Sequence, residues 1–270
     1  MKSLTYGEEK RGDERMWLRL RQIAGVAENL RSVESDIQEI LGVAVCFRDP
    51  GVGYFGLENA LFPIGNQLLE IVSPIEENTA GGRYIRRRGG DSGYMVITQC
   101  DDHSLRRAQI DKLGIRTVLD NKTSDFINLQ MHPRDTGGTF FEIDQQLGAE
   151  ALLRDGPWHP AGPNWQRAKR LDRVLGILAA EIQCDDPALV AHRWAEIAQL
   201  QIDQSDEVYE LVLENALLRF VPCTDGRPEG LGGIDLETRN RAIILDEAEK
   251  RGKISGDNQI SICGIRMNLI

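Results

Sequence analysis

The stretch LRLRQIAGVAENLRSVESDIQEILG, residues 18 to 42, decides the fold, because a strand pattern passes directly into a helix pattern. Residues 18–27 predict a strand. Residues 29–42 predict an amphipathic helix, since apolar residues recur at helical spacing at Leu30, Val33, Ile37 and Ile40. The segments GLENALFPIG (56–65) and NQLLEIVSP (66–74) then predict two strands joined by a tight turn. This order of elements predicts a β-α-β-β-β unit.

The same order of elements recurs later in the chain. YMVITQC (94–100) predicts a strand and SLRRAQIDKLG (104–114) a helix that ends at a glycine, and three further strands are expected in IRTVLD, DFINLQMH and TFFEID. A chain that repeats one supersecondary unit is expected to pack the copies together. We therefore predict an α+β fold in which paired βαβββ modules form half-open, cup-like mixed β-sheets, with the first such domain over residues 17–150.

A stretch rich in proline, glycine and tryptophan, PWHPAGPNW (157–165), predicts a linker over residues 151–169. Its Trp158 and Trp165 are expected to pack between domains. Residues 170–270 then predict a second, degenerate domain of the same kind. Its expected elements are a strand, a helix over 186–200, a hairpin near 207–222 and a strand-helix-strand remnant at the end.

Composition limits the class of protein. The 270 residues carry 42 acidic against 32 basic side chains, and the net charge of -10 argues against a nucleic-acid partner. No apolar run approaches the roughly 18 residues that a spanning helix needs, and the charged start does not resemble a secretion signal. We expect a cytoplasmic protein with a frayed N-terminus and no membrane partner. The five scattered cysteines are expected to be free thiols, and a homodimer is the base-rate expectation for assembly.

Five segments stand in the order and spacing of a known superfamily: QIAGVAENL, GLENALFPIG, LLEIVSPIEENTAGGRYIRRRGG, YMVITQCDD and HPRDTGGTFFEID. Through them residues 18–146 resemble the vicinal-oxygen-chelate superfamily, which includes glyoxalases, bleomycin-resistance proteins and dioxygenases. The pattern is closest to that of the methylmalonyl-CoA epimerase family. The resemblance implies two βαβββ units that roll into a cup around a divalent metal, and a small-molecule substrate or ligand inside that cup.

The resemblance places the four metal-ligand positions of the superfamily at Gln22, Glu70, Met95 and Glu142. Both histidines of the superfamily pattern are replaced, by Gln22 and Met95. Zinc, nickel and cobalt favour imidazole nitrogen, and a thioether is a poor ligand for magnesium or manganese. We therefore expect no cofactor. If a divalent metal does bind, the expected ligands are Gln22, Glu70 and Glu142.

Carboxylates that share a cup without a cation cannot all remain ionised, so at least one should have a raised pKa and exchange protons near neutrality. Strand alternation suggests that Glu58, Glu70 and Glu142 are these groups. The resemblance also gives Glu58 the position of a base that abstracts a proton next to a carbonyl. The alternative is a wet cavity inherited from a metal-binding ancestor. The side chains expected to contact a substrate are Asn59, Gln22, Met95, Gln99 and His132.

Two functional hypotheses follow. The sequence has no GxSxG elbow, no P-loop and no GxGxxG motif after a strand. The first is a glyoxalase-like isomerase, epimerase or lyase that acts on a small carbonyl-containing acid or acyl thioester through carboxylate acid–base chemistry. The second is a metal-free protein that binds or sequesters a small molecule, in the manner of bleomycin-resistance proteins.

Overall fold

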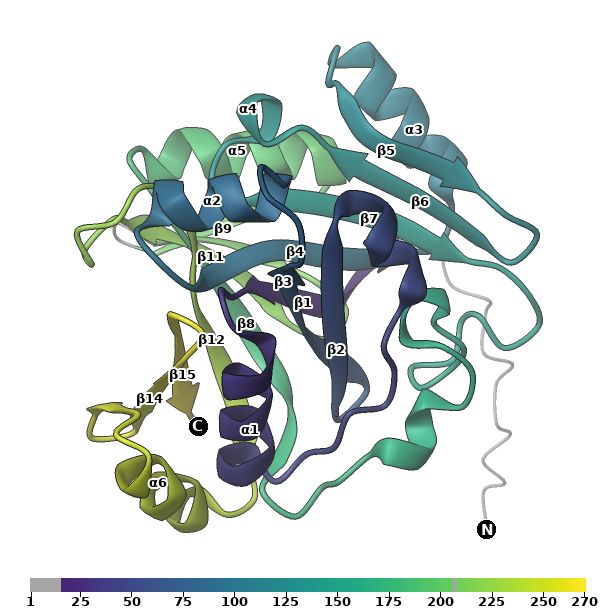
Figure 1. Ribbon diagram of the computed structural model, residues 1–270. Coiled ribbons are helices and arrows are strands. Elements are labelled where there is room, and N and C mark those ends of the chain that lie inside the picture. Colours follow the sequence, from purple (N-terminus) through teal and green to yellow (C-terminus); the bar gives the residue numbers. More distant parts are fainter. Residues whose placement is uncertain (1–15, 206–207) are drawn as a thin grey trace, which may run out of the picture.

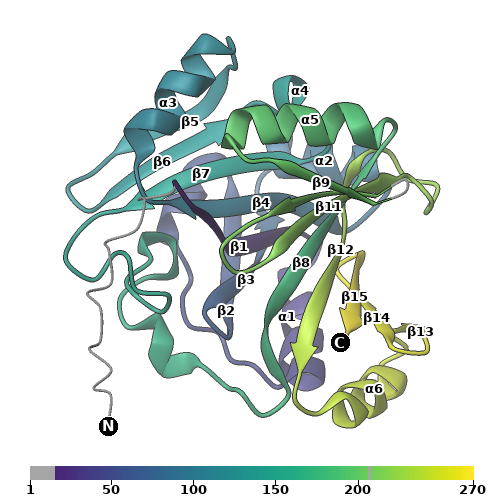
Figure 2. The same cartoon turned by 180° about the vertical axis from the view of Figure 1, so that it is seen from behind.

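Two open, mixed β-sheets form the framework of the protein, with the helices packed around them (Figures 1 and 2). The computed structural model describes residues 16–205 and 208–270. The first sheet has seven strands in the order β2-β3-β1-β4-β7-β6-β5, and the second has eight in the order β13-β14-β15-β12-β8-β11-β10-β9. The predicted α+β class with paired βαβββ modules is confirmed. Most of the charged start of the chain lies outside the described residues.

The first sheet is built from residues 18–146. Its first unit contains β1 (Leu18–Val26), α1 (Leu30–Leu41), β2 (Leu57–Ile64) and β3 (Gln67–Pro74), and its second contains β4 (Ser92–Cys100), α3 (His103–Lys112), β5 (Thr117–Lys122), β6 (Phe126–Met131) and β7 (Phe140–Gln146). Strand β1 pairs parallel with β3 and antiparallel with β4, and β4 pairs parallel with β7. In the first unit one strand is reduced to a single bridge between Phe47 and Leu61. The connections contain η1 (Pro50–Phe55), α2 (Ala80–Arg88) and α4 (Pro133–Thr136).

The second sheet repeats this pairing scheme. Its elements are β8 (Val174–Cys184), α5 (Pro187–Ala198), β9 (Ile202–Ser205), β10 (Val208–Val212), β11 (Leu217–Pro222), β12 (Gly230–Thr238), α6 (Arg241–Lys250), β13 (Ile254–Gly256), β14 (Gln259–Ile262) and β15 (Ile265–Leu269). Strand β8 pairs parallel with β11 and antiparallel with β12, and β12 pairs parallel with β15. Both βαβββ units of the second sheet are therefore complete. The prediction of a strand-helix-strand remnant at the end of the chain is wrong. The short edge strands β9 and β13 are exposed and carry little apolar pattern, so sequence alone did not predict them.

One apolar core is shared by the two sheets. It contains Ile23 and Phe141 from the first sheet and Ile182 and Ile265 from the second, all fully buried. Helix α1 packs beside α6, and α3 beside α5. The convex sides of the sheets thus face this common core, and their concave sides face outward.

Gly93 in β4 is required for the close approach of the two sheets. A β-carbon at this position would overlap the backbone carbonyl of Leu231 in β12. We expect Gly93→Ala to lower the free energy of unfolding by about 1–3 kcal/mol, because backbone atoms cannot move aside as a flexible side chain could. Urea unfolding measures this. Gly53→Ala is the matched control, since a β-carbon there meets open space, and an equal loss in both variants would contradict the packing argument.

Candidate functional site

Residues 151–169 lie across the concave face of the first sheet rather than between the two halves (Figure 1). They include η2 (His159–Ala161) and η3 (Trp165–Ala168). Trp158 and Trp165 are each only 1% exposed, and they pack against a set of apolar side chains on that face, namely Leu61, Leu68, Ile97 and Phe126. The expectation that these tryptophans pack between domains is therefore wrong. One end of the cup is filled by the chain itself.

Hydrogen bonds hold this segment in place. Gln99 donates its side-chain amide to the carbonyl of Ala151 at 2.8 Å, and the carbonyl of Gln146's side chain accepts from the backbone N–H of His159 at 2.8 Å. The guanidinium of Arg21 donates to the carbonyl of Gly156 at 2.8 Å. It also lies 5.4 Å from the Trp158 ring centre and 5.2 Å from that of Trp165. Burial lowers the pKa of Arg21 to about 9.

Glu70 from β3 is clamped by two amide groups. Gln22 donates to Glu70 Oε2 at 2.8 Å, and Asn59 donates to Glu70 Oε1 at 2.5 Å. Each amide is held in this orientation by a second bond. Trp158 Nε1–H donates to Gln22 Oε1 at 2.9 Å, and the backbone N–H of Asp49 donates to Asn59 Oδ1 at 2.8 Å. Both amides must therefore present N–H groups, and not carbonyl oxygens, to the carboxylate.

A second carboxyl pair lies on β7. Glu142 and Asp144 are two residues apart on one strand, so both point into the cup. Asn128 on β6 donates to Glu142 Oε1 and, at 3.0 Å, to Asp144 Oδ1, which also accepts from the backbone N–H of Leu129 at 3.0 Å. Sequence reasoning missed Asn128 and Asp144. The strand period could have indicated Asp144, whereas Asn128 lies in a strand with no distinguishing pattern.

Burial sets the electrostatics of these carboxyl groups. Desolvation raises the pKa of Glu70 to about 7, and this outweighs the opposing effect of the hydrogen bonds from Asn59 and Gln22. Desolvation also raises the pKa of Glu142, and desolvation together with the neighbouring Glu142 raises that of Asp144 well above its ordinary value. The charge of Glu142 further raises the pKa of Glu70. The cup therefore holds three carboxyl groups with raised pKa values, that of Glu70 being about 7.

Glu58 is not among the residues that the fold brings together. Leu61 pairs with Glu70 across β2 and β3, so the odd-numbered residues of β2, including Asn59, share the side of Glu70. Glu58 therefore lies on the opposite face and is exposed. The expectation that Glu58 shares the cup with Glu70 and Glu142 is wrong, because the register of β2 and β3 turns it to the other face.

The other expected substrate contacts have different surroundings. Met95 is half-buried on β4, beside Phe140 of β7 in register. Gln99 is buried beneath the start of the 151–169 segment. His132 precedes α4, and its Nδ1 accepts from the backbone N–H of Arg134 at 3.1 Å, so this histidine caps the turn. Of the predicted site residues, Gln22 and Asn59 are hydrogen-bonded to Glu70. Glu142 lies close enough to raise the pKa of Glu70.

The donor set does not fit the divalent metal that the resemblance implies. The carbonyl oxygen of Gln22 accepts from Trp158, so this residue turns N–H toward Glu70, and N–H cannot coordinate a cation. Met95 offers a thioether, which hard cations disfavour. Among residues 16–205 and 208–270, no group of three or more histidine, cysteine, aspartate or glutamate side chains has the arrangement of a metal site.

The end of the cup farther from the tryptophans is apolar and aromatic. Tyr94 lies 4.9 Å, between ring centres, from both Tyr84 of α2 and Phe140. Val52, Met95 and Phe140 pack against this cluster while remaining partly exposed. This end of the concave face, beside η1 and α2, therefore keeps some apolar surface exposed.

Comparisons with known proteins establish the fold and no more. No protein-family model matches the sequence, and no curated protein is detectably similar to it. A solved structure of a hypothetical protein from Staphylococcus aureus matches 94% of this chain and 99% of its own, with 12% sequence identity and a TM-score of 0.63. That likeness shows a shared fold over both halves.

Several methylmalonyl-CoA epimerase structures match about half of the chain, and two of them show the extent of the match. The one from Streptomyces coelicolor, in complex with 2-nitronate-propionyl-CoA, matches 49% of this chain and 99% of its own at 18% identity, with a TM-score of 0.44. The one from Mycobacterium tuberculosis matches 48% of this chain and 88% of its own at 16% identity, with a TM-score of 0.42. Neither match is strong enough to transfer an activity.

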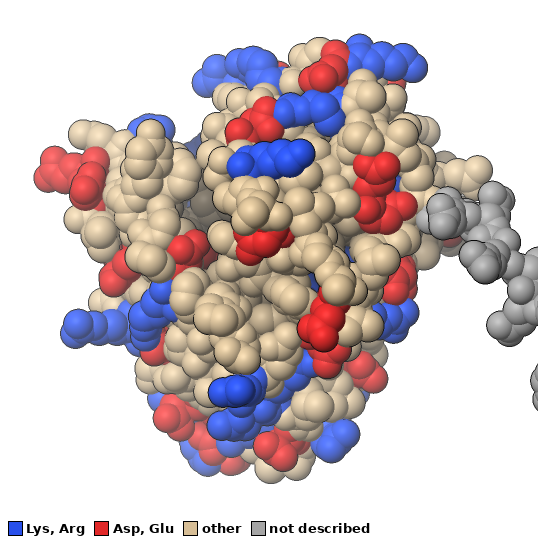
Figure 3. Space-filling view, turned by 90° about the vertical axis from the view of Figure 1, so that its right-hand side faces the viewer, with Lys and Arg blue, Asp and Glu red and all other residues tan. Residues whose placement is uncertain are grey.

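Surface charge is mixed in sign on the face shown in Figure 3, where basic and acidic side chains are interspersed. The described part of the chain contains no helix that is long and apolar enough to cross a membrane.

Proposed function

We propose that the protein is a metal-independent acid–base enzyme of the isomerase or epimerase type, which acts on a small carbonyl-containing acid or its thioester. One observation carries the proposal: Glu70 is held by two oriented amides, in a cup that also contains Glu142 and Asp144, with a pKa near neutrality. A base with such a pKa can take a proton and return it at physiological pH.

The proposed chemistry uses carboxyl groups on the two strands that flank the central pair. Glu70 and Glu142 come from β3 and β7, which flank the central pair β1 and β4. In its ionised form Glu70 removes the proton next to the substrate carbonyl, and the Glu142–Asp144 pair, which retains a proton, donates to the resulting carbanion. The amide N–H groups of Gln22 and Asn59 stabilise the ionised form of Glu70.

Hydrogen–deuterium exchange tests this proposal. We expect the full chain to exchange the α-hydrogen of 2-substituted acyl thioesters or small 2-oxo acids in D₂O, followed by NMR. Glu70→Gln should slow exchange at least about 100-fold, the usual contribution of a general base. Glu58→Gln is the matched control, because this residue lies on the other face of the neighbouring strand. Full activity in Glu70→Gln would refute the assignment of the base.

Metal removal gives a separate prediction. Because the donor set around Glu70 does not fit a divalent cation, dialysis against EDTA is expected to leave the exchange rate unchanged. If the exchange rate falls on dialysis and returns when one kind of metal ion is added, the enzyme is not metal-independent. The role of Glu70 would then still be tested by the Glu70→Gln variant.

The aromatic end of the cup supports a second candidate, a small-molecule binding protein. Both oxygens of Glu70 are already hydrogen-bonded, and the Tyr84, Tyr94 and Phe140 cluster offers contact area to an apolar ligand. This candidate predicts that aromatic acids bind with dissociation constants unaffected by Glu70→Gln, without hydrogen exchange in any thioester or acid tested.

A further inference from the structure

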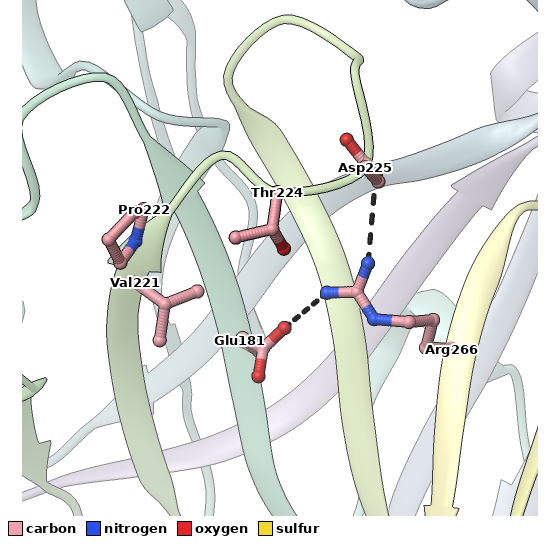
Figure 4. Close-up of a pocket in the computed structure, with 6 residues that line it drawn as sticks. All are labelled: Glu181, Val221, Pro222, Thr224, Asp225 and Arg266. Carbon is pink, nitrogen blue, oxygen red and sulfur yellow. Dashed lines mark hydrogen bonds and ion pairs between the residues drawn. The ribbon is translucent and has the colours of Figure 1, made fainter. Parts of the chain in front are cut away.

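The concave face of the second sheet contains a cavity that the proposed function does not use. The cavity has a volume of about 520 Å³ and is lined by Glu181, Val221, Pro222, Thr224, Asp225 and Arg266 (Figure 4). Its volume lies within the range of small-molecule sites. Whereas residues 151–169 fill one end of the first cup, the side chains of Glu181, Asp225 and Arg266 keep part of their surface exposed.

A glycine stands between the two charged residues Glu181 and Arg266. Gly233 of β12 pairs with Glu181 of β8 and with Arg266 of β15. At the matching place in the first sheet, Ile97 pairs with Gln22 and with Glu142. Arg266 therefore occupies the position that corresponds to Glu142, and glycine replaces the bulky isoleucine between the two outer positions. The second cup thus presents a guanidinium where the first presents a carboxyl group.

Charges of both signs converge beside an apolar wall. In Figure 4 the guanidinium of Arg266 points between Glu181 and Asp225. It forms an ion pair with Glu181, but it lies 3.7 Å from the carboxylate of Asp225, which is too far for a hydrogen bond. Asp225 is held in place by Gln183, which donates at 2.8 Å, and by the backbone N–H of Arg227 at 2.9 Å. Val221 and Pro222 form the apolar side of the cavity.

The neighbouring ion pairs leave an excess of negative charge. Arg219 contacts Asp235 at 3.0 Å and Glu210 at 3.1 Å. With Glu181 and Asp225, these make four carboxylates against three guanidinium groups, those of Arg219 and Arg266 and that of Arg88, which also acts on Asp225. A purely anionic ligand would therefore be repelled by the acidic groups, and a purely cationic one would meet Arg266 directly.

We propose that this cavity binds a small zwitterion of the α-amino-acid class with a compact apolar side chain. Its carboxylate is received by Arg266, its ammonium group by Asp225, and its side chain packs on Val221 and Pro222. The ligand carries adjacent charges of opposite sign, and so does the cavity. Because Arg266 and Asp225 are not hydrogen-bonded to each other, each can bond to the ligand.

Calorimetric titration of the full chain with three matched probes tests the proposal. The probes are L-valine, 3-methylbutanoate, which lacks the ammonium group, and isobutylamine, which lacks the carboxylate. We expect saturable binding of L-valine, and binding at least about tenfold weaker for each of the others, because each loses a charge-assisted hydrogen-bonding group. The absence of saturable L-valine binding, or equal binding of either fragment, would overturn the proposal.

Two variants locate the site. Arg266→Gln and Asp225→Asn should each weaken L-valine binding at least about tenfold, whereas Arg241→Gln on α6, away from the cavity, should not. Melting curves show whether each variant is folded, and unchanged binding in both folded site variants would overturn the assignment. Glu70→Gln should bind L-valine normally, so failure here is distinguishable from failure of the proposed enzyme activity.

Discussion

Replacement of Trp158 with alanine is expected to lower the free energy of unfolding by about 4 kcal/mol, within the range for deleting a fully buried tryptophan. The indole packs against the concave face of the first sheet, at 1% exposure, and its ring centre lies 5.3 Å from that of Phe126. Its loss also leaves the carbonyl oxygen of Gln22 without its donor. Urea unfolding, followed by circular dichroism, measures the difference.

Leu152→Ala is the matched control for this segment. Leu152 belongs to the same stretch of chain but is 63% exposed, so its truncation should change the free energy of unfolding by no more than about 0.5 kcal/mol. A loss below about 1 kcal/mol in Trp158→Ala would mean that the segment does not fill the cup in solution.

Stability is expected to fall as the pH rises from about 5 to about 8, and Glu70 is expected to cause much of this fall. Its pKa is about 7 in the folded protein against an ordinary value of 4.5. Below pH 4.5 the Glu70 carboxyl group is protonated in both the folded and the unfolded state, so its burial does not change the stability with pH. Between the two values the unfolded state releases the proton that the folded state retains. The folded state is therefore progressively disfavoured, by about 3 kcal/mol in all, and the loss levels off above the folded pKa.

The free energy of unfolding of Glu70→Gln, measured across this pH range, checks the prediction. In this variant the fall in the free energy of unfolding should be smaller by about 3 kcal/mol. Any remaining fall is expected from Glu142 and Asp144, whose pKa values are also raised. Glu58→Gln should keep the full pH dependence. Identical pH profiles in wild type and Glu70→Gln would show that Glu70 is not buried as described.

Much of the first cup could be predicted because its residues obey strand periodicity. The order of strands and the resemblance predict Gln22, Glu70 and Glu142 as site residues. The structure places Gln22 against Glu70, and Glu142 lies near enough to raise the pKa of Glu70. Glu58 was misplaced because a one-residue difference in register exchanges the two faces of a strand. The sequence does not predict Asn128, because its contact with Glu142 joins β6 to β7, which are separated in the chain by α4, and no local pattern marks such a pair.

By itself, the sequence determined the order of strands and helices, the repetition of the βαβββ unit and the loss of the histidines, since each is written in local spacing and residue type. Only the tertiary structure decided that Trp158 and Trp165 fill one cup and that Arg266, Glu181 and Asp225 meet in the other. Those contacts join residues far apart in the chain. Their existence depends on strand register and on which face each element buries, and many different sequences satisfy the same local pattern while making different long-range contacts.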